Sequence, residues 1–322
     1  MLMGGIIMNE QIKVSVICLA FNHANNIRKC LEGFVNQKTN FDYEVLVHDD
    51  ASTDGTTEII KEYEKNYPHI IKPIYQKENQ YSQGVKITKK YILPKMKGEY
   101  VAWCEGDDYW SDSNKLQKQI DFLDQNSDYA ICAHKVLFNN LKTKTEHIVP
   151  KIDIDRDFTV DEIIKKGAIV QLSSIIMRTA LYLNKPDCFY AKGFGDIQLY
   201  IYGAICGKFR VINEVMSVYN HGTEGSWTKR IADIPEKNII HSLEQIRMYN
   251  EVNRYYAFKY NESFTYAISR SYFNIAVSKK DKKEMRKLEY REFYNQYKRA
   301  QRVKFLQKKL PGLYGLLKKI KG

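Results

Sequence analysis

Short apolar runs alternate with polar segments through the N-terminal third of the chain. Near-continuous apolar runs of this length are typical of strands that are buried on both faces. They are found at residues 14–20, 43–48, 70–75 and 100–104. After the first two runs, apolar residues recur at three- and four-residue steps, which predicts helices at 27–34 and 57–66. Strands that alternate with helices in this way predict an α/β fold, with a doubly wound, mostly parallel sheet flanked by helices.

The pattern is less regular in the middle of the chain. Polar residues dominate from 136 to 160, which suggests an excursion from the sheet or a hairpin. Further strands are predicted at 173–178, 209–212 and 215–219, and a helix is predicted at 195–206.

After Pro235 the sequence reads as helical, rich in tyrosine and lysine. We therefore predict two parts, a sheet-containing domain at 12–232 and a helical C-terminal extension at 233–322. The charge follows the same division. Residues 279–322 hold 16 Lys/Arg against 4 Asp/Glu, which accounts for the whole formal net charge of +12. The basic surplus therefore concerns a partner of the extension and not of the larger domain.

Composition and cysteine usage set further bounds. Hydrophobic residues make up 44% of the chain, and no apolar run approaches the length needed to span a bilayer. The start of the chain lacks the basic region and the long apolar region of a signal peptide. Six cysteines are scattered without the close pairs of a zinc site, which predicts reduced, buried thiols. We therefore expect a cytoplasmic protein.

Three carboxylates, those of Glu105, Asp107 and Asp108, lie within four positions directly after the apolar run that ends at Trp103. A strand that ends in acids delivers them to the carboxyl edge of the sheet, where α/β proteins bind ligands. Adjacent carboxylates repel each other, and a divalent cation that also bridges to phosphates would compensate them. The alternative is a strand followed by the acidic first turn of a helix.

A second polar block, at 49–55, follows the strand at 43–48. It reads either as a capped turn or as a carboxylate site for a nucleobase or a ribose. The chain has no Gly-x-Gly-x-x-Gly after its first strand and no P-loop, so it lacks the phosphate cradles that those motifs supply. Nucleotide binding through acids and a metal is the hypothesis that remains.

Three blocks together resemble the inverting glycosyltransferases of family 2, which have the GT-A fold. They are VSVICLAFN at 14–22, VHDDASTDGT at 47–56 and EGDDYW at 105–110. The resemblance covers roughly residues 12 to 230, and the order and spacing of the blocks are more specific than any one of them. It implies a GT-A domain that binds a nucleotide sugar, most simply a UDP-sugar.

The resemblance also implies roles for individual residues. Asp108 would bind Mg²⁺ or Mn²⁺ directly, and Asp107 would contact the ribose and the metal. This chain departs from the family in having Glu105 as the first acid of that motif. The implied nucleotide-binding residues are Leu19, Ala20, Asn22, Asp49, Asp50, Lys86 and Asp107. Lys86 alternatively belongs to a solvated helix face.

Two further candidates come from the later part of the resemblance. Asp196 occupies the place of the family's general base, although Gly195 stands where another acid is common; the alternative is a helix N-cap. His221 is a candidate metal ligand near Asn220, which replaces a usual arginine, and its alternative is a loop or packing residue. Both assignments are implied by the resemblance.

The C-terminal tail shows a basic amphipathic pattern. Lysines are interspersed with apolar residues at three- and four-residue steps. The apolar positions are Val303, Leu306, Leu310, Leu313, Leu317 and Ile320. One reading is docking on an anionic membrane surface, and the other is packing of the stripe on the catalytic domain. Nucleic-acid binding is not expected, because the rest of the chain has no basic surplus and no recognition motif.

The function expected from the residues and the resemblance is that of a metal-dependent, hexosyltransferase-type enzyme. It would move a sugar with inversion from a nucleotide-diphosphate donor to a hydroxyl of a glycan or lipid-linked acceptor, in surface polysaccharide biosynthesis. The expected location is cytoplasmic, with peripheral attachment at the inner face of the membrane left open. The alternative is a non-catalytic nucleotide-sugar-binding or membrane scaffold protein.

Overall fold

A computed structural model describes residues 11–189, 195–223 and 234–309. Contacts within the chain divide it into two compact units that meet in sequence at residues 230 and 231, close to the boundary expected at 232. The first unit holds every described strand, and the described part of the second unit is helical.

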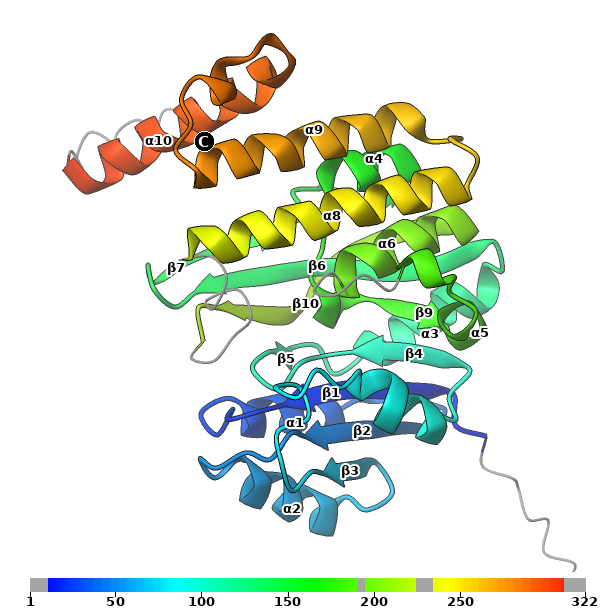
Figure 1. Ribbon diagram of the computed structural model, residues 1–322. Helices are drawn as coiled ribbons and strands as arrows, with labels where there is room; N and C mark the ends of the chain where they lie inside the picture. Colours follow the sequence, from blue (N-terminus) through cyan, green and yellow to red (C-terminus); the bar gives the residue numbers. More distant parts are fainter. Residues whose placement is uncertain (1–10, 190–194, 224–233, 310–322) are drawn as a thin grey trace, which may run out of the picture. The chain divides into compact units, whose positions relative to one another are not determined.

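The N-terminal half of the sheet is parallel. Its strand order is β3-β2-β1-β4, and each neighbouring pair runs in the same direction (Figure 1). The four predicted strands are therefore confirmed, as β1 (Val14–Ala20), β2 (Tyr43–Asp49), β3 (Ile71–Tyr75) and β4 (Tyr100–Trp103). Parallel neighbours bring the carboxyl ends of β1, β2 and β4 to one edge of the sheet, where the acidic blocks begin.

Alternation along β1 explains how the helices pack. Val14, Val16 and Cys18 belong to one buried apolar cluster with residues of α1 (Ile27–Val35) and α3 (Lys115–Gln125). Successive side chains of a strand point to opposite faces, so these positions share one face of the sheet. The other predicted helix of this region is α2 (Thr56–Asn66). No disulfide joins the cysteines of the described chain. Four of them are buried as expected, whereas Cys188 is half-buried and Cys206 is exposed.

The second half of the sheet is mixed. The strand order continues from β4 through β9 (Ile176–Arg178), β6 (Tyr129–Asn140) and β10 (Lys208–His221) to β5 (Tyr109–Trp110). Only β6 and β10 are parallel neighbours here, and the other pairs of this path are antiparallel. The remaining elements of the unit are β7 (Thr145–Val149), β8 (Arg156–Phe158), α4 (Val160–Lys166), α5 (Thr179–Leu183) and α6 (Gly195–Cys206).

Three predictions are refined in this half. The polar segment after 136 is the hairpin of β6 and β7. The strands expected at 209–212 and 215–219 are one strand, β10, whose pairing shifts register on both sides of Val215. The strand expected at 173–178 is shortened to β9 because 172–174 form a 3₁₀ turn.

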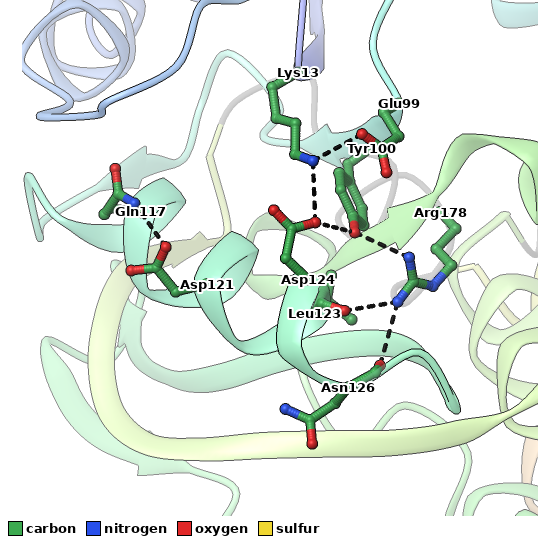
Figure 2. Close-up of polar contacts among 9 residues, drawn as sticks. All are labelled: Lys13, Glu99, Tyr100, Gln117, Asp121, Leu123, Asp124, Asn126 and Arg178. Atoms are coloured by element: carbon green, nitrogen blue, oxygen red, sulfur yellow. Dashed lines mark hydrogen bonds and ion pairs between the residues drawn. The ribbon is translucent and has the colours of Figure 1, made fainter.

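Arg178 joins three elements around the end of α3. Its guanidinium donates to the backbone oxygens of Leu123 and Asn126, at 2.7 and 3.2 Å, and to the Tyr100 hydroxyl at 2.9 Å (Figure 2). The Tyr100 hydroxyl in turn donates to Asp124 at 2.6 Å. The Leu123 and Asn126 oxygens also accept from the N–H groups of Asn126, at 3.3 Å, and Tyr129, at 3.2 Å. Arg178 therefore adds a charged donor at the C-terminal end of α3 and ties that end to the sheet.

The described part of the second unit contains three long helices. The helices α8 (Pro235–Tyr255) and α9 (Asn261–Ser278) lie along each other, and α10 (Arg291–Lys309) packs its first half on α9 (Figure 1). The apolar contact between α9 and α10 centres on Phe273 and Phe293. No helix in the described ranges combines the length and the apolar character that crossing a membrane requires.

Replacement of Arg178 tests the importance of this junction. Arg178→Met should lower the free energy of unfolding by about 2–3 kcal/mol, because it removes the charged donor of the hydrogen bonds to the Leu123 and Asn126 oxygens and to the Tyr100 hydroxyl. Arg178→Lys should recover only part of the loss, since lysine keeps the charge without the planar fork. The measurement is urea unfolding. Asp121→Ala, which touches only an exposed pair with Gln117, should stay within about 0.5 kcal/mol of wild type.

Candidate functional site

The end of β1 holds both acidic loops through its backbone. The Gly106 N–H donates to the Leu19 oxygen at 2.9 Å, and the Asp50 N–H donates to the Ala20 oxygen at 3.0 Å. Leu19 and Ala20 therefore lie between the loop that follows β2 and the loop that follows β4. Their backbone oxygens fix the positions of both loops relative to the sheet.

Asp49 is committed to the turn that follows β2. Its Oδ1 accepts from the Ser52 N–H at 3.2 Å and its Oδ2 accepts from the Thr57 hydroxyl. Asp49 therefore stabilises the turn before α2, as in the capped-turn alternative given above.

Asp50 holds a separate loop. Its two carboxylate oxygens accept from the backbone N–H groups of Gln80, at 2.7 Å, and Tyr81, at 3.0 Å. Two donors on one carboxylate anchor the segment that leaves β3 against the end of β2. Lys86 follows in the same segment and its side chain is exposed.

The loop after β1 is fastened to the loop after β2. Asn22 has a left-handed backbone with φ of 55°; its N–H donates to the Ser52 hydroxyl at 2.9 Å and its Oδ1 accepts from the Thr53 N–H at 2.9 Å. The Ala24 N–H donates to Asp54 at 3.0 Å. Asn26, which directly precedes α1, makes no side-chain cap there.

Asp107 and Asp108 are held from β10. The Asn220 N–H donates to Asp108 Oδ1 at 2.9 Å, and the Asn220 amide nitrogen donates to the Asp107 backbone oxygen at 2.8 Å. The Thr223 hydroxyl donates to Asp107 Oδ2 at 2.7 Å. Among the described residues, no hydrogen bond is made to Asp107 Oδ1 or Asp108 Oδ2. Each carboxylate therefore keeps one oxygen for a ligand.

The charges of this cluster are poorly compensated. Burial and the neighbouring charge of Asp107 raise the pKa of Asp108 well above its ordinary value. Glu105 retains solvent contact, but the surrounding protein and the charges of Asp107 and Asp196 raise its pKa to about 8. Burial also raises the pKa of Asp196. The ionised forms of these carboxylates are disfavoured in the ligand-free protein. A bound cation would stabilise them.

The residues present fit a metal shared with a ligand rather than a site built wholly from protein. In the part of the chain that the structure describes, no group of three His, Cys, Asp or Glu residues has metal-holding geometry. Asp107 and Asp108 can supply two carboxylates, and Mg²⁺ is commonly bound by one or two carboxylates together with substrate phosphates.

His221 does not join the acids. Its ring lies 5.2 Å from Phe138 and 6.3 Å from Tyr219, measured between centroids. Side chains alternate along a strand, so Asn220 faces Asp107 while His221 and Tyr219 share the opposite face of β10. This placement is that of a packing residue.

Asp196 does join them. It lies in the first turn of α6, where its Oδ1 accepts from the Ile197 N–H at 2.8 Å. Its charge acts on Glu105 and on Tyr200, so its carboxylate lies within electrostatic range of Glu105, the first acid after β4. Asp196 therefore both accepts a hydrogen bond in the first turn of α6 and acts electrostatically on Glu105.

Three contributors had no assigned role in the sequence-based site. Asn220 was noted only as a departure from the family, and Thr223 carries no recognisable motif. His23 follows Asn22 in the first loop and lies against the turn at Gly106. A histidine or threonine in a loop is too common to be singled out by type alone.

The sequence from residue 15 to 178 matches the family described as Glycosyl transferase family 2. That is just over half of the 322 residues. The chain belongs to glycosyltransferase family 2. The matched stretch includes both acidic loops of the site and ends before α6 and β10.

Relatives extend the likeness beyond that stretch. An uncharacterized protein of Mycobacterium tuberculosis is 34% identical over 222 residues, 68% of this chain and 62% of that protein. The chain therefore matches less than two thirds of the length of that relative. The UDP-Glc:alpha-D-GlcNAc-diphosphoundecaprenol beta-1,3-glucosyltransferase WfgD of Escherichia coli is 24% identical over 213 residues, 63% of this chain and 79% of that protein.

Solved structures share the fold. TarS of S. aureus, in complex with UDP-GlcNAc, superposes with a TM-score of 0.56 at 18% identity, covering 90% of this chain and 92% of that one. A mannosyltransferase of Pyrobaculum calidifontis, in complex with GDP-Man and Mn²⁺, gives 0.55 at 14% identity, covering 91% and 81%. These likenesses confirm the expected GT-A fold with helices after the sheet.

Asp108 should make the metal-free protein less stable as the pH rises. An unfolded aspartate has a pKa of about 3.9, and the folded-state pKa of Asp108 is higher. Its favourable contribution to folding is therefore fully present below about pH 4 and is lost as the pH rises toward the folded pKa. Asp108→Asn cannot ionise, so its stability relative to wild type should increase from pH 4 to pH 8.

Urea unfolding in EDTA measures this difference. The exposed variant Asp121→Asn is the matched control and should show no comparable trend. A stability difference between Asp108→Asn and wild type that stays constant across this pH range would contradict the assignment.

Proposed function

We propose that this protein is an inverting glycosyltransferase that transfers a sugar from a nucleoside diphosphate donor, most simply a UDP-sugar, to a hydroxyl group. The observation that carries the proposal is the pair Asp107 and Asp108, each with an oxygen open to a ligand. The neighbouring Glu105 is within electrostatic range of Asp196. Their position at the carboxyl edge of parallel strands is where α/β proteins bind ligands. The nucleotides in the solved relatives support the same donor class.

Asp107 and Asp108 would hold Mg²⁺ or Mn²⁺ in this mechanism. The metal would neutralise the negative charge of the diphosphate as it leaves. Thr223 and Asn220 orient the two carboxylates, so their open oxygens are directed before the donor arrives. A preorganised site avoids the cost of ordering these side chains during the reaction.

Asp196 would act as the general base. The acceptor hydroxyl oxygen attacks the anomeric carbon while the bond from that carbon to the diphosphate oxygen breaks, and the hydroxyl proton passes to Asp196. One displacement inverts the configuration at the anomeric carbon. Burial raises the pKa of Asp196, and a base works best when its pKa approaches the working pH.

The acceptor follows from the relatives by analogy. The name of WfgD describes transfer to a sugar on diphosphoundecaprenol, which supports a glycan or lipid-linked acceptor in surface polysaccharide biosynthesis for this chain. Such an acceptor would be met at the inner face of the cell membrane, in keeping with the proposed cytoplasmic, peripheral location. The alternative remains a non-catalytic protein that binds nucleotide sugars or acts as a membrane scaffold.

Donor binding and turnover separate these alternatives. In calorimetry, UDP should bind the wild type with Mn²⁺ and not in EDTA, and Asp108→Ala should lose most of the metal-dependent affinity. Asp196→Asn should keep that affinity and lose about 10²–10⁴-fold in release of sugar from UDP-sugars, as for loss of a general base. The exposed Asp187→Asn is the matched control. Binding without any turnover favours the scaffold, and normal turnover by Asp196→Asn places the base elsewhere.

We propose further that the basic segment 279–322 attaches the protein to anionic membrane. Four apolar positions of its predicted stripe lie outside the described residues, namely Leu310, Leu313, Leu317 and Ile320. Beyond the packed first half of α10, Val303 is 37% exposed and Phe305 is 59% exposed. Lys298, Arg299 and Arg302 lie on the same stretch. Each basic residue near an anionic surface contributes about 1 kcal/mol, and an exposed aromatic adds apolar burial.

Vesicle flotation tests the attachment. The full chain should float with phosphatidylglycerol-containing vesicles and not with pure phosphatidylcholine, and salt should weaken binding by screening. Phe305→Ser and the triple change of Lys298, Arg299 and Arg302 to Gln should each release the protein while donor hydrolysis is retained. If these variants unfold the chain, or if the wild type ignores anionic vesicles, the stripe is a packing surface.

A further inference from the structure

His23 covers the turn that carries the acids. A Cβ placed on Gly106 would stand 2.8 Å from His23 Nδ1, 3.0 Å from Ile27 and 3.3 Å from Ala20. The imidazole therefore packs directly on the backbone between Glu105 and Asp107. Nothing in the reaction scheme above uses this ring, although it lies at the centre of the site.

The backbone of His23 is held firmly. Its N–H donates to the Thr56 hydroxyl at 2.8 Å, and its oxygen accepts from the N–H groups of Asn26 and Ile27 at 2.8 Å each. Thr56 is itself fixed by Asp54 at the start of α2. The ring is therefore presented from a rigid loop, as a binding group requires.

The two nitrogens of the ring have different surroundings. Nδ1 is buried and has no hydrogen-bond partner among the described residues, whereas Nε2 is not enclosed in this way. In a neutral imidazole one nitrogen carries the proton and the other accepts. Placing the proton on Nε2 leaves a donor at the accessible edge of the ring, because a proton on Nδ1 would be an unpaired buried N–H.

The charges of Asp107, Asp54 and Asp49 all act on the ring. These are the acids of the loops that end β2 and β4. The accessible edge of His23 thus belongs to the same ligand-binding edge as the open oxygens of Asp107 and Asp108. His23 does not act as a third metal ligand beside Asp107 and Asp108, because the described residues form no group of three side chains that could hold a metal.

We propose that His23 donates a hydrogen bond from Nε2 to an acceptor oxygen of the bound nucleoside diphosphate. This proposal rests on the proposed function, since it names a further contact of the same donor site. The oxygen belongs either to the nucleoside or to the diphosphate, and both offer the acceptor chemistry that the ring requires. His23 is a binding residue and takes no part in the proton transfer.

Calorimetry with UDP and Mn²⁺ tests the contact in the full chain. His23→Leu should weaken UDP binding about three- to tenfold, the loss expected for one neutral hydrogen bond. His23→Gln should bind within twofold of wild type, because its amide nitrogen reaches the place of Nε2. His23→Asn should resemble His23→Leu, because its shorter side chain does not reach that place. His69→Leu, on an exposed site, is the matched control and should change nothing.

The outcomes are distinct. Absence of UDP binding by the wild type overturns the proposed function itself. Unchanged affinity in His23→Leu, or equal weakening in His23→Leu and His23→Gln at unchanged melting temperatures, overturns the contact and leaves packing as the role of the ring. If a variant has a lower melting temperature, its affinity for UDP is measured at a temperature below its unfolding transition. The comparison of His23→Gln with His23→Asn then still tests the contact. Titration with uridine then assigns the oxygen, because a nucleoside contact weakens uridine and UDP equally and a diphosphate contact weakens UDP alone.

Discussion

Buried negative charge at the end of β4 is the constraint on which the rest of the site depends. Asp107 is 8% exposed and Asp108 is 4% exposed, and the two follow each other in the chain. Taking carboxylates out of water is costly unless hydrogen bonds or a cation compensate them. The protein supplies hydrogen bonds to one oxygen of each and leaves the other open, so the ligand-free fold carries a cost that a bound cation relieves.

The compensation that the protein does provide comes from far along the chain. Asn220 and Thr223 reach the acids across 112 and 116 residues. They can do so because β5, directly after Asp108, pairs antiparallel with β10. The mixed half of the sheet therefore completes a site that begins in the parallel half. The family match, which ends at residue 178, contains the acids but neither Asn220 nor Thr223.

Sequence patterns located the elements whose burial leaves a clear signal. Strands β1, β2 and β4 are buried along almost their whole length, and three acids lie within four positions after β4, so both could be found from the chain alone. The single strand β10 could not, because Asn213 and Glu214 interrupt its apolar run and the structure absorbs them in a register shift. Asn213 is satisfied there by contacts to Asp153 and Asp155.

The candidate site divides in the same way. Carboxylates can be predicted because few residue types serve their chemistry, but their neighbours act through a backbone N–H, a hydroxyl or a ring edge, which many positions could provide. The sequence motif also does not predict which face of the strand a side chain occupies. His221 and Asn220 are adjacent in sequence, and only the alternation of β10 decides that Asn220 meets the acids.

The packing at Gly106 links positions that are far apart in sequence and restricts how they can diverge. The space above its Cα is shared by side chains from the end of β1, the following loop and α1, at Ala20, His23 and Ile27. A larger residue at 106 requires a smaller one at a facing position, so these sites should vary together among descendants of a common ancestor. A larger side chain at any one of them alone would displace the acidic turn.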